Sequence, residues 1–242
     1  MPRRRCSSEH EYVYHVLNRA AKSSVLFGTS QDYRVFETIL TEAIALIGIR
    51  VLAYCIMPNH WHFVLWPTSS THLARFMHWL TLTHSHRWQK FHEVVGTGAV
   101  YQGRYKALPI QTDTHFLTVC RYVERNALRA GLVKDAQDWP WSSLWRRAHG
   151  SQEWLHPWPV GRPTDWLAIV NGRESEPELG QIRSAITRGA PLGSSEWCIK
   201  TAEELGIESS LRTPGRPKKD PGTVSVIAPP ASPRKTRSLW DE

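Results

Sequence analysis

Between residues 11 and 150, segments with the hydrophobic pattern of β-strands alternate with segments in which apolar residues recur at helical spacing. Segments rich in β-branched and aromatic residues are typical of strands, and there are four of them: Tyr12–Leu17, Arg50–Met57, His60–Trp66 and Tyr105–Ile110. Apolar residues at helical spacing mark three further segments: Gln31–Ile49, Leu73–Phe91 and Thr114–Ala130, the last closed by Gly131. This order predicts an α+β fold with a small mixed or antiparallel sheet and helices packed on one face.

The chain changes character after residue 150. Tryptophans and prolines are interleaved near residues 154–166, and two short helical stretches follow around 178–187 and 196–205. From Arg212 to the end, six prolines and seven Lys or Arg residues stand against three acids in 31 residues, a composition that buries little apolar surface. We therefore predict a catalytic domain at 1–150, a helical accessory region at 151–212 and a disordered basic tail at 213–242.

The overall charge favours a polyanionic partner. Lys and Arg total 30 against 22 acids, which gives a formal charge of +8 and a pI near 9.5. A basic balance of this size is common in proteins that bind nucleic acid, although it does not by itself establish binding.

Several classes of protein are disfavoured by what the sequence lacks. Its four cysteines are far apart and form no CxxC pair, so neither a zinc knuckle nor a disulfide framework is indicated. No apolar run has the length of a membrane span, and no GxxxxGK[ST] phosphate loop occurs. We expect a soluble cytoplasmic protein, associated with the nucleoid, that uses no nucleotide cofactor and no membrane.

The first candidate site lies on the third predicted strand. Because side chains alternate between the faces of a strand, His60 and His62 point the same way and Trp61 points into the opposite layer. Two imidazoles side by side on a stiff strand provide half of a divalent metal site. The alternative is a pair of ordinary strand histidines.

The second candidate site lies on the last predicted helix of the catalytic domain. Its apolar residues form one stripe: Phe116, Val119, Cys120, Val123 and Ala127. Tyr122 and Asn126 are one turn apart at the edge of that stripe, flanked by Arg125 and Arg129. Such an edge can present a phenol, an amide oxygen and positive charge to one cleft. The alternative is an amphipathic helix with a solvated basic edge.

Together these residue types suit phosphoryl transfer. A metal ion polarises the scissile phosphate, arginines offset its charge, and a tyrosine attacks in line to form a phosphotyrosine ester. Two successive transesterifications conserve the energy of the phosphodiester bond, so strand exchange of this kind needs no ATP. The missing phosphate loop agrees with that chemistry.

Four segments in order resemble the HUH-type single-tyrosine transposases of the insertion-sequence 200 class, and most closely the REP-associated tyrosine transposases. They are YHVLNR at Tyr14–Arg19, YCIMPNHWHFVL at Tyr54–Leu65, YQGRYK at Tyr101–Lys106 and RYVERNALRAGLV at Arg121–Val133. The resemblance covers about residues 10–150 and extends to PLGSSEW and GRPKK near the C-terminus. It implies a ferredoxin-like HUH endonuclease fold.

The resemblance also implies roles for individual residues. Tyr122 would be the nucleophile, His60 and His62 metal ligands, and Asn126 the third ligand, with Mg²⁺ or Mn²⁺ as the cofactor. Such enzymes cleave single-stranded DNA at hairpin-associated sites and leave a 5′-phosphotyrosine and a free 3′-OH. Ala127 stands where the family often has proline, and alanine is the easier helix residue.

Further basic residues are candidates for DNA binding. Arg104 and Lys106 alternate on the fourth predicted strand and face one way, so both could hold DNA backbone, as ordinary surface charges also would. In the tail, Gly215–Lys219 resembles the AT-hook core, in which arginine follows a narrow minor groove. That comparison makes Arg216, Lys218 and Lys219 candidates for a non-specific DNA anchor.

Three other functions remain open from the sequence. The first is a replication initiator or relaxase-type nickase with the same catalytic elements. The second is a domesticated protein that binds hairpin DNA without transposition, and the third is a metal hydrolase that uses water. The sequence also leaves open a monomer or a homodimer that exchanges nucleophile helices, and Glu124 as an alternative third ligand.

Overall fold

Four strands form one antiparallel sheet in the computed structural model, which describes residues 11–21, 24–151 and 153–212. The strands are β1 (Val13–Arg19), β2 (Arg50–Met57), β3 (His60–Trp66) and β4 (Lys106–Ile110), in the spatial order β2-β3-β1-β4. Helix α1 (Ser30–Ile47) connects β1 to β2, and α2 (Ser70–Phe91) connects β3 to β4. This β-α-β-β-α-β order is ferredoxin-like, which confirms the predicted fold class.

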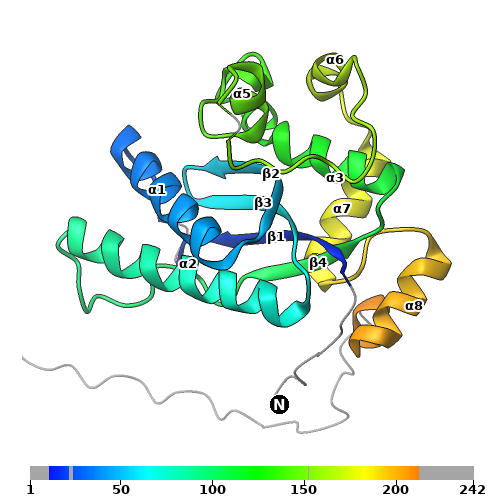
Figure 1. The fold of residues 1–242 in the computed structure, drawn as a ribbon, viewed down its shortest axis with the longest axis horizontal. Helices are drawn as coiled ribbons and strands as arrows, with labels where there is room; N and C mark the ends of the chain where they lie inside the picture. The colour runs from blue at the N-terminus through cyan, green and yellow to red at the C-terminus, as the bar shows by residue number, and fades with distance from the viewer. Residues whose placement is uncertain (1–10, 22–23, 152, 213–242) are drawn as a thin grey trace, which may run out of the picture. The chain divides into compact units, whose positions relative to one another are not determined.

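One face of the sheet is covered by α1 and α2, which lie side by side (Figure 1). Trp61 and Phe63 of β3 pack there against Phe36 of α1 and Phe76 of α2, and none of these four side chains is exposed to solvent. The start of α1 is closed by a capping box between Thr29 and its N3 residue, the kind of local signal that begins a helix.

The opposite face is covered as well, which corrects the expectation that helices pack on one face only. There α3 (Thr114–Glu124) lies against the sheet, and Val119 and Val123 join Val64 of β3 in a second hydrophobic core. The sequence carries a sign of this arrangement, because residues 51–57 read VLAYCIM without a charged side chain, and all seven are buried in the structure. A strand with no polar side requires cover on both faces.

The predicted helix Thr114–Ala130 is divided in the structure. It ends as α3 at Glu124 and resumes as α4 (Asn126–Arg129), with Arg125 between them at φ −82° and ψ −4°. Gly131 then adopts φ +70°, a left-handed conformation that suits glycine and ends the helix as predicted.

The remaining segments follow as short helices: η2 (Ala136–Asp138), α5 (Ser143–Ala148), α6 (Trp166–Asn171), α7 (Glu176–Arg188), α8 (Ser195–Leu205) and η3 (Glu208–Leu211). Trp166 of α6 and Ile182 of α7 belong to the second core, so the predicted accessory region shares its packing with the sheet. No helix in the described part of the chain is long and apolar enough to span a membrane. The predicted tail at 213–242 lies outside the described residues.

Candidate active site

Strand β3 carries the two candidate metal ligands on the face that α3 covers. The ring centroids of His60 and His62 are 5.1 Å apart, and Trp61 packs into the core on the opposite face, as the strand period predicts. Because β3 is paired with β1 on one side and with β2 on the other, the backbone of both residues is fixed by the sheet.

Both imidazoles are held through the same ring nitrogen. His60 Nδ1 lies 2.7 Å from the side-chain oxygen of Asn59, and His62 Nδ1 lies 2.9 Å from Nε2 of His15. A histidine that is anchored through one nitrogen presents the other to a ligand in a set orientation. Nε2 is therefore the metal-binding atom that each ring can offer.

The protein keeps these imidazoles neutral. Burial, reinforced by the charges of Arg19 and Arg129, lowers the pKa of His60 to about 4. Burial first, and then the neighbouring histidines, holds the pKa of His62 well below its ordinary value. A neutral imidazole has the free lone pair that metal coordination requires.

The candidate nucleophile lies directly beside the histidine pair. The ring centroid of Tyr122 is 5.8 Å from that of His62 and 6.0 Å from that of His15, with both rings edge-on to it. Tyr122 is held there because Val119 and Val123 on the same helix are fully buried in the second core. All three rings come from one chain.

Asn126 completes this cluster at the first residue of α4. Its side chain lies close enough to His60 to act on the histidine pKa, which it raises against the larger effect of burial. The Nδ2 atom of Asn126 is buried and has no hydrogen-bond partner among the described residues. An unpaired buried N–H group is costly and calls for an acceptor, whereas it is the amide oxygen Oδ1 that could bind a cation.

The donor set fits a hard divalent cation. No three His, Cys, Asp or Glu side chains are grouped as a metal site in residues 11–21, 24–151 and 153–212. His60 and His62 would supply two imidazole nitrogens, and Asn126 would supply an amide oxygen. An amide oxygen suits Mg²⁺ or Mn²⁺ better than it suits zinc.

Glu124, the alternative third ligand, points elsewhere. Its carboxylate accepts hydrogen bonds from Ser143 Oγ at 2.6 Å and from Trp166 Nε1 at 2.7 Å. Burial raises the pKa of this carboxyl, and the two hydrogen bonds partly offset that effect. Both oxygens are thus engaged by α5 and α6, and Glu124 ties the helix of Tyr122 to those elements.

The arginines next to the nucleophile also contact the segment 166–174. Arg125 donates to the carbonyls of Val170 and Asn171 at 2.7 and 2.8 Å, and it lies 3.4 Å from Glu174. Arg129 forms a 2.9 Å ion pair with Glu174. These contacts join the nucleophile helix to the accessory region, and a role of either arginine on DNA stays a prediction.

The other predicted DNA-binding residues have different surroundings. Arg104 is exposed in the turn before β4, and Lys106 is exposed and donates to the carbonyl of Ile186 at 3.0 Å. Arg216, Lys218 and Lys219 lie outside the described residues.

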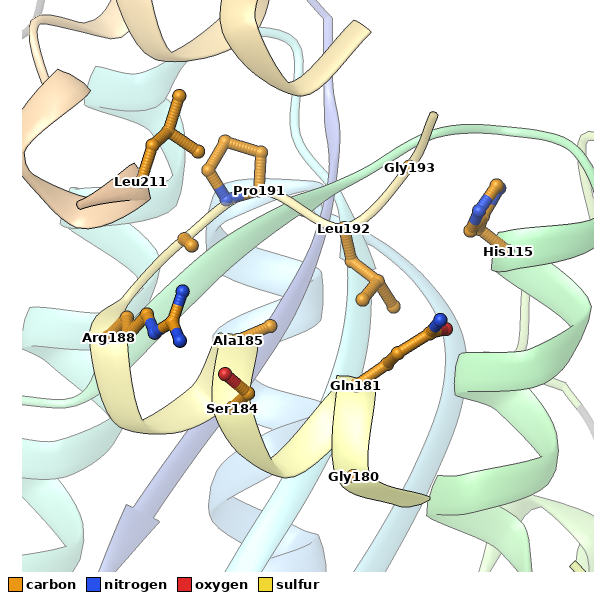
Figure 2. Close-up of a pocket in the computed structure, with 11 residues that line it drawn as sticks. His115, Gly180, Gln181, Ser184, Ala185, Arg188, Pro191, Leu192, Gly193 and Leu211 are labelled. Carbon is orange, nitrogen blue, oxygen red and sulfur yellow. The ribbon is translucent and has the colours of Figure 1, made fainter. Parts of the chain in front are cut away.

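A separate cavity of about 460 Å³ lies between α7, the start of α3 and the loop before α8 (Figure 2). Arg188, His115 and Gln181 are its largest polar lining residues. Gly193 closes one side, and a Cβ atom there would come within 2.6 Å of the side-chain oxygen of Gln111. None of the predicted site residues lines this cavity.

His15 is the member of the site that sequence reasoning missed. It lies on β1 and is only 2% exposed. The signal was a polar residue in an otherwise apolar strand, YHVL, but the sequence does not show that β1 lies next to β3.

The fold and the site together define a ferredoxin-like α+β protein with a histidine, tyrosine and asparagine cluster on one face of its sheet. Residues 8–126 match the family model of IS200-like transposases, and this part of the chain belongs to that family. The match includes His60, His62, Tyr122 and Asn126.

The solved structures that are similar to the chain include the following two. One is the REP-associated tyrosine transposase bound to a REP hairpin, at 18% identity and a TM-score of 0.47, covering 73% of this chain and 99% of that one. The other is a protein described as a transposase from Deinococcus radiodurans, at 19% identity and a TM-score of 0.36, covering 51% and 96%. A search of curated proteins finds no match.

Proposed function

We propose that this protein is a metal-dependent transposase that cleaves and rejoins single-stranded DNA at hairpin sequences of the REP type through a 5′-phosphotyrosine intermediate. The observation that carries the proposal is the position of the Tyr122 ring, 5.8 Å from the ring of His62 in the same chain. The family match at residues 8–126 supports DNA transposition as the general activity. The motif series from YHVLNR to RYVERNALRAGLV supports a REP-like hairpin as the substrate.

In the proposed reaction, Oη of Tyr122 attacks the phosphorus of the scissile phosphodiester. The bond from phosphorus to the 3′-oxygen breaks, that oxygen takes up the proton that the phenol has lost, and a free 3′-OH results. The new ester retains the phosphodiester energy, so attack by a 3′-OH on the phosphotyrosine reverses the step and rejoins strands.

The surrounding residues prepare that attack. His60, His62 and Asn126 would hold Mg²⁺ or Mn²⁺, which when bound supplies Lewis-acid polarisation of the phosphate. Arg129 keeps a positive charge against the ring of Tyr122. Tyr122 is 8% exposed, so the phenol is packed in one orientation and has little rotational freedom to lose on reaction.

The test is the capture of a covalent protein–DNA adduct. Purified protein is incubated with a 3′-labelled single-stranded hairpin oligonucleotide and Mn²⁺, because the 3′ fragment is the one that the phosphotyrosine retains, and the products are then separated under denaturing conditions. We expect an adduct with wild type and none with Tyr122→Phe, while Tyr105→Phe, a half-buried tyrosine before β4, serves as the matched control. Nicking without an adduct would favour water as nucleophile, and hairpin binding without nicking would favour a DNA-binding protein that has lost cleavage.

A further inference from the structure

His15 and His62 form a pair of imidazoles buried between the sheet and the nucleophile helix. In the β1–β3 pairing His15 is opposite Val64 and His62 is opposite Leu17, so the two histidines are diagonal neighbours on one face. Their rings are stacked with centroids 5.1 Å apart, and His15 Nε2 is 2.9 Å from His62 Nδ1. The two side chains are 2% and 4% exposed, so water does not compete for this contact.

Only one proton arrangement of this pair leaves His62 able to bind a metal. If His62 Nδ1 donates to His15, then His62 Nε2 has no proton and its lone pair is available. In the reverse arrangement His15 donates to His62 Nδ1, so the neutral ring of His62 carries its proton on Nε2. In that state neither nitrogen of His62 has a free lone pair.

We propose that His15 is a positioning residue that accepts a hydrogen bond from His62 Nδ1 and thereby holds His62 in the tautomer that presents Nε2 to the catalytic metal. His15 then has its own proton on Nδ1. The inference rests on the metal site of the proposed function and adds to it a residue outside the ligand set.

The comparison with His60 supports this assignment. His60 Nδ1 is 2.7 Å from Asn59 Oδ1, an oxygen that can only accept, so His60 donates from Nδ1 and presents Nε2. His15 provides the equivalent acceptor for the second ring, from a different strand. The two ligands would then approach the metal through the same ring nitrogen, each with an anchored opposite side.

His15 also contacts the nucleophile. Its ring is edge-on to that of Tyr122 with centroids 6.0 Å apart, and it is thus packed between the histidine strand and α3. Replacement by a ring without an acceptor preserves most of this packing and removes the hydrogen bond. His15→Phe therefore separates the two contributions, and His15→Gln restores an acceptor oxygen.

The experiment measures Mn²⁺ binding by calorimetry and the His62 tautomer by ¹⁵N NMR of histidine-labelled, metal-free protein. We expect His15→Phe to weaken Mn²⁺ binding by about 10- to 100-fold, the range typical of lost outer-shell partners. His15→Gln should stay within a few-fold of wild type. His84→Phe is the matched control, because His84 is 1% exposed on α2, away from the metal ligands, and pairs with Tyr101. The wild-type spectrum should show His62 protonated on Nδ1, assigned by its loss in His62→Ala.

Each outcome is decisive. Absence of Mn²⁺ binding by wild type would overturn the proposed metal site. Normal binding by a folded His15→Phe, or equal weakening by His15→Phe and His15→Gln, would overturn the positioning role alone. If His15→Phe does not fold, the wild-type spectrum decides, because a proton on His62 Nε2 contradicts the proposal.

Discussion

The guanidinium of Arg129 lies over the ring of Tyr122, with its Cζ atom 4.0 Å from the ring centroid. The same group donates to the carbonyl of Tyr122 at 3.2 Å and pairs with Glu174 at 2.9 Å. Arg129 is therefore held by three contacts, and its guanidinium packs against the ring of the candidate nucleophile. A cation over an aromatic face contributes about 0.5–2 kcal/mol, depending on solvent exposure.

Arg129→Gln is expected to slow DNA cleavage by about tenfold or more, which corresponds to about 1.4 kcal/mol of lost transition-state stabilisation. Single-turnover cleavage of a hairpin oligonucleotide measures this rate. The matched control is Arg121→Gln, since Arg121 binds the carbonyls of Gly172 and Arg173 but does not contact the ring of Tyr122. Equal rates for both variants would mean that the contact with Tyr122 is not used in catalysis.

Asn126→Ala is expected to weaken metal binding without removing it, because a neutral amide is lost while His60 and His62 remain. Cleavage plotted against Mn²⁺ concentration should shift to higher concentrations and recover partly at saturation. Asn171→Ala controls for lost stability, since that side chain accepts a hydrogen bond from Ala136 in the accessory packing. Superimposable curves for wild type and Asn126→Ala would place the third ligand elsewhere.

Mixing two inactive variants tests whether the active site is built within one chain. Tyr122 lies beside His62 of the same chain, so a mixture of Tyr122→Phe and His60→Ala should remain inactive in single-stranded DNA cleavage. An exchanged helix would instead combine an intact tyrosine with an intact histidine pair in one of the two sites. Recovery of activity toward a quarter to a half of wild type would therefore show exchange between subunits.

Glu124→Ala is expected to destabilise the fold rather than to alter metal affinity. It leaves the buried Nε1–H of Trp166 without its acceptor, at about 1–3 kcal/mol, while Ser143 Oγ still has the carbonyl of Tyr54 within reach. Urea denaturation measures the loss, and Glu196→Ala on the exposed start of α8 is the control, with a change within about 0.5 kcal/mol. A stable Glu124→Ala protein with weakened Mn²⁺ binding would return Glu124 to the ligand set.

The buried neutral histidines predict a loss of stability in mild acid. Burial lowers the pKa of His15 and of His84 to about 3, against 6.5 for an ordinary histidine. Between these values the unfolded chain binds protons that the native protein does not, so the free energy of unfolding rises with pH and levels off above about 6.5. Each histidine contributes about 1.4 kcal/mol per pH unit inside that window.

Urea denaturation between pH 4.5 and 7.5 checks this dependence, and His84→Phe isolates one histidine. The variant should show a shallower slope by about one proton below pH 6.5 and no difference in slope above it. Parallel curves across the whole range would mean that His84 is protonated as readily in the native protein as in the unfolded chain.

The sequence by itself determined the elements and the sides on which their residues lie. The period of two residues places His60 and His62 on one face of β3, and the period of 3.6 residues places Tyr122 and Asn126 together on one side of their helix. Such relationships are local, because they depend only on backbone geometry over a few residues. Strand β3 and the buried stripe of α3 were predictable for this reason.

Only the tertiary structure decided which residues meet across elements. The pairing of β1 with β3 brings His15 to His62, 47 residues away in the chain, and no local pattern specifies that register. The chain after residue 150 likewise returns to the nucleophile helix, where Glu174 pairs with Arg129. Side-chain periodicity identifies a face but not its partner, because the partner is selected by the packing of distant segments into a common core.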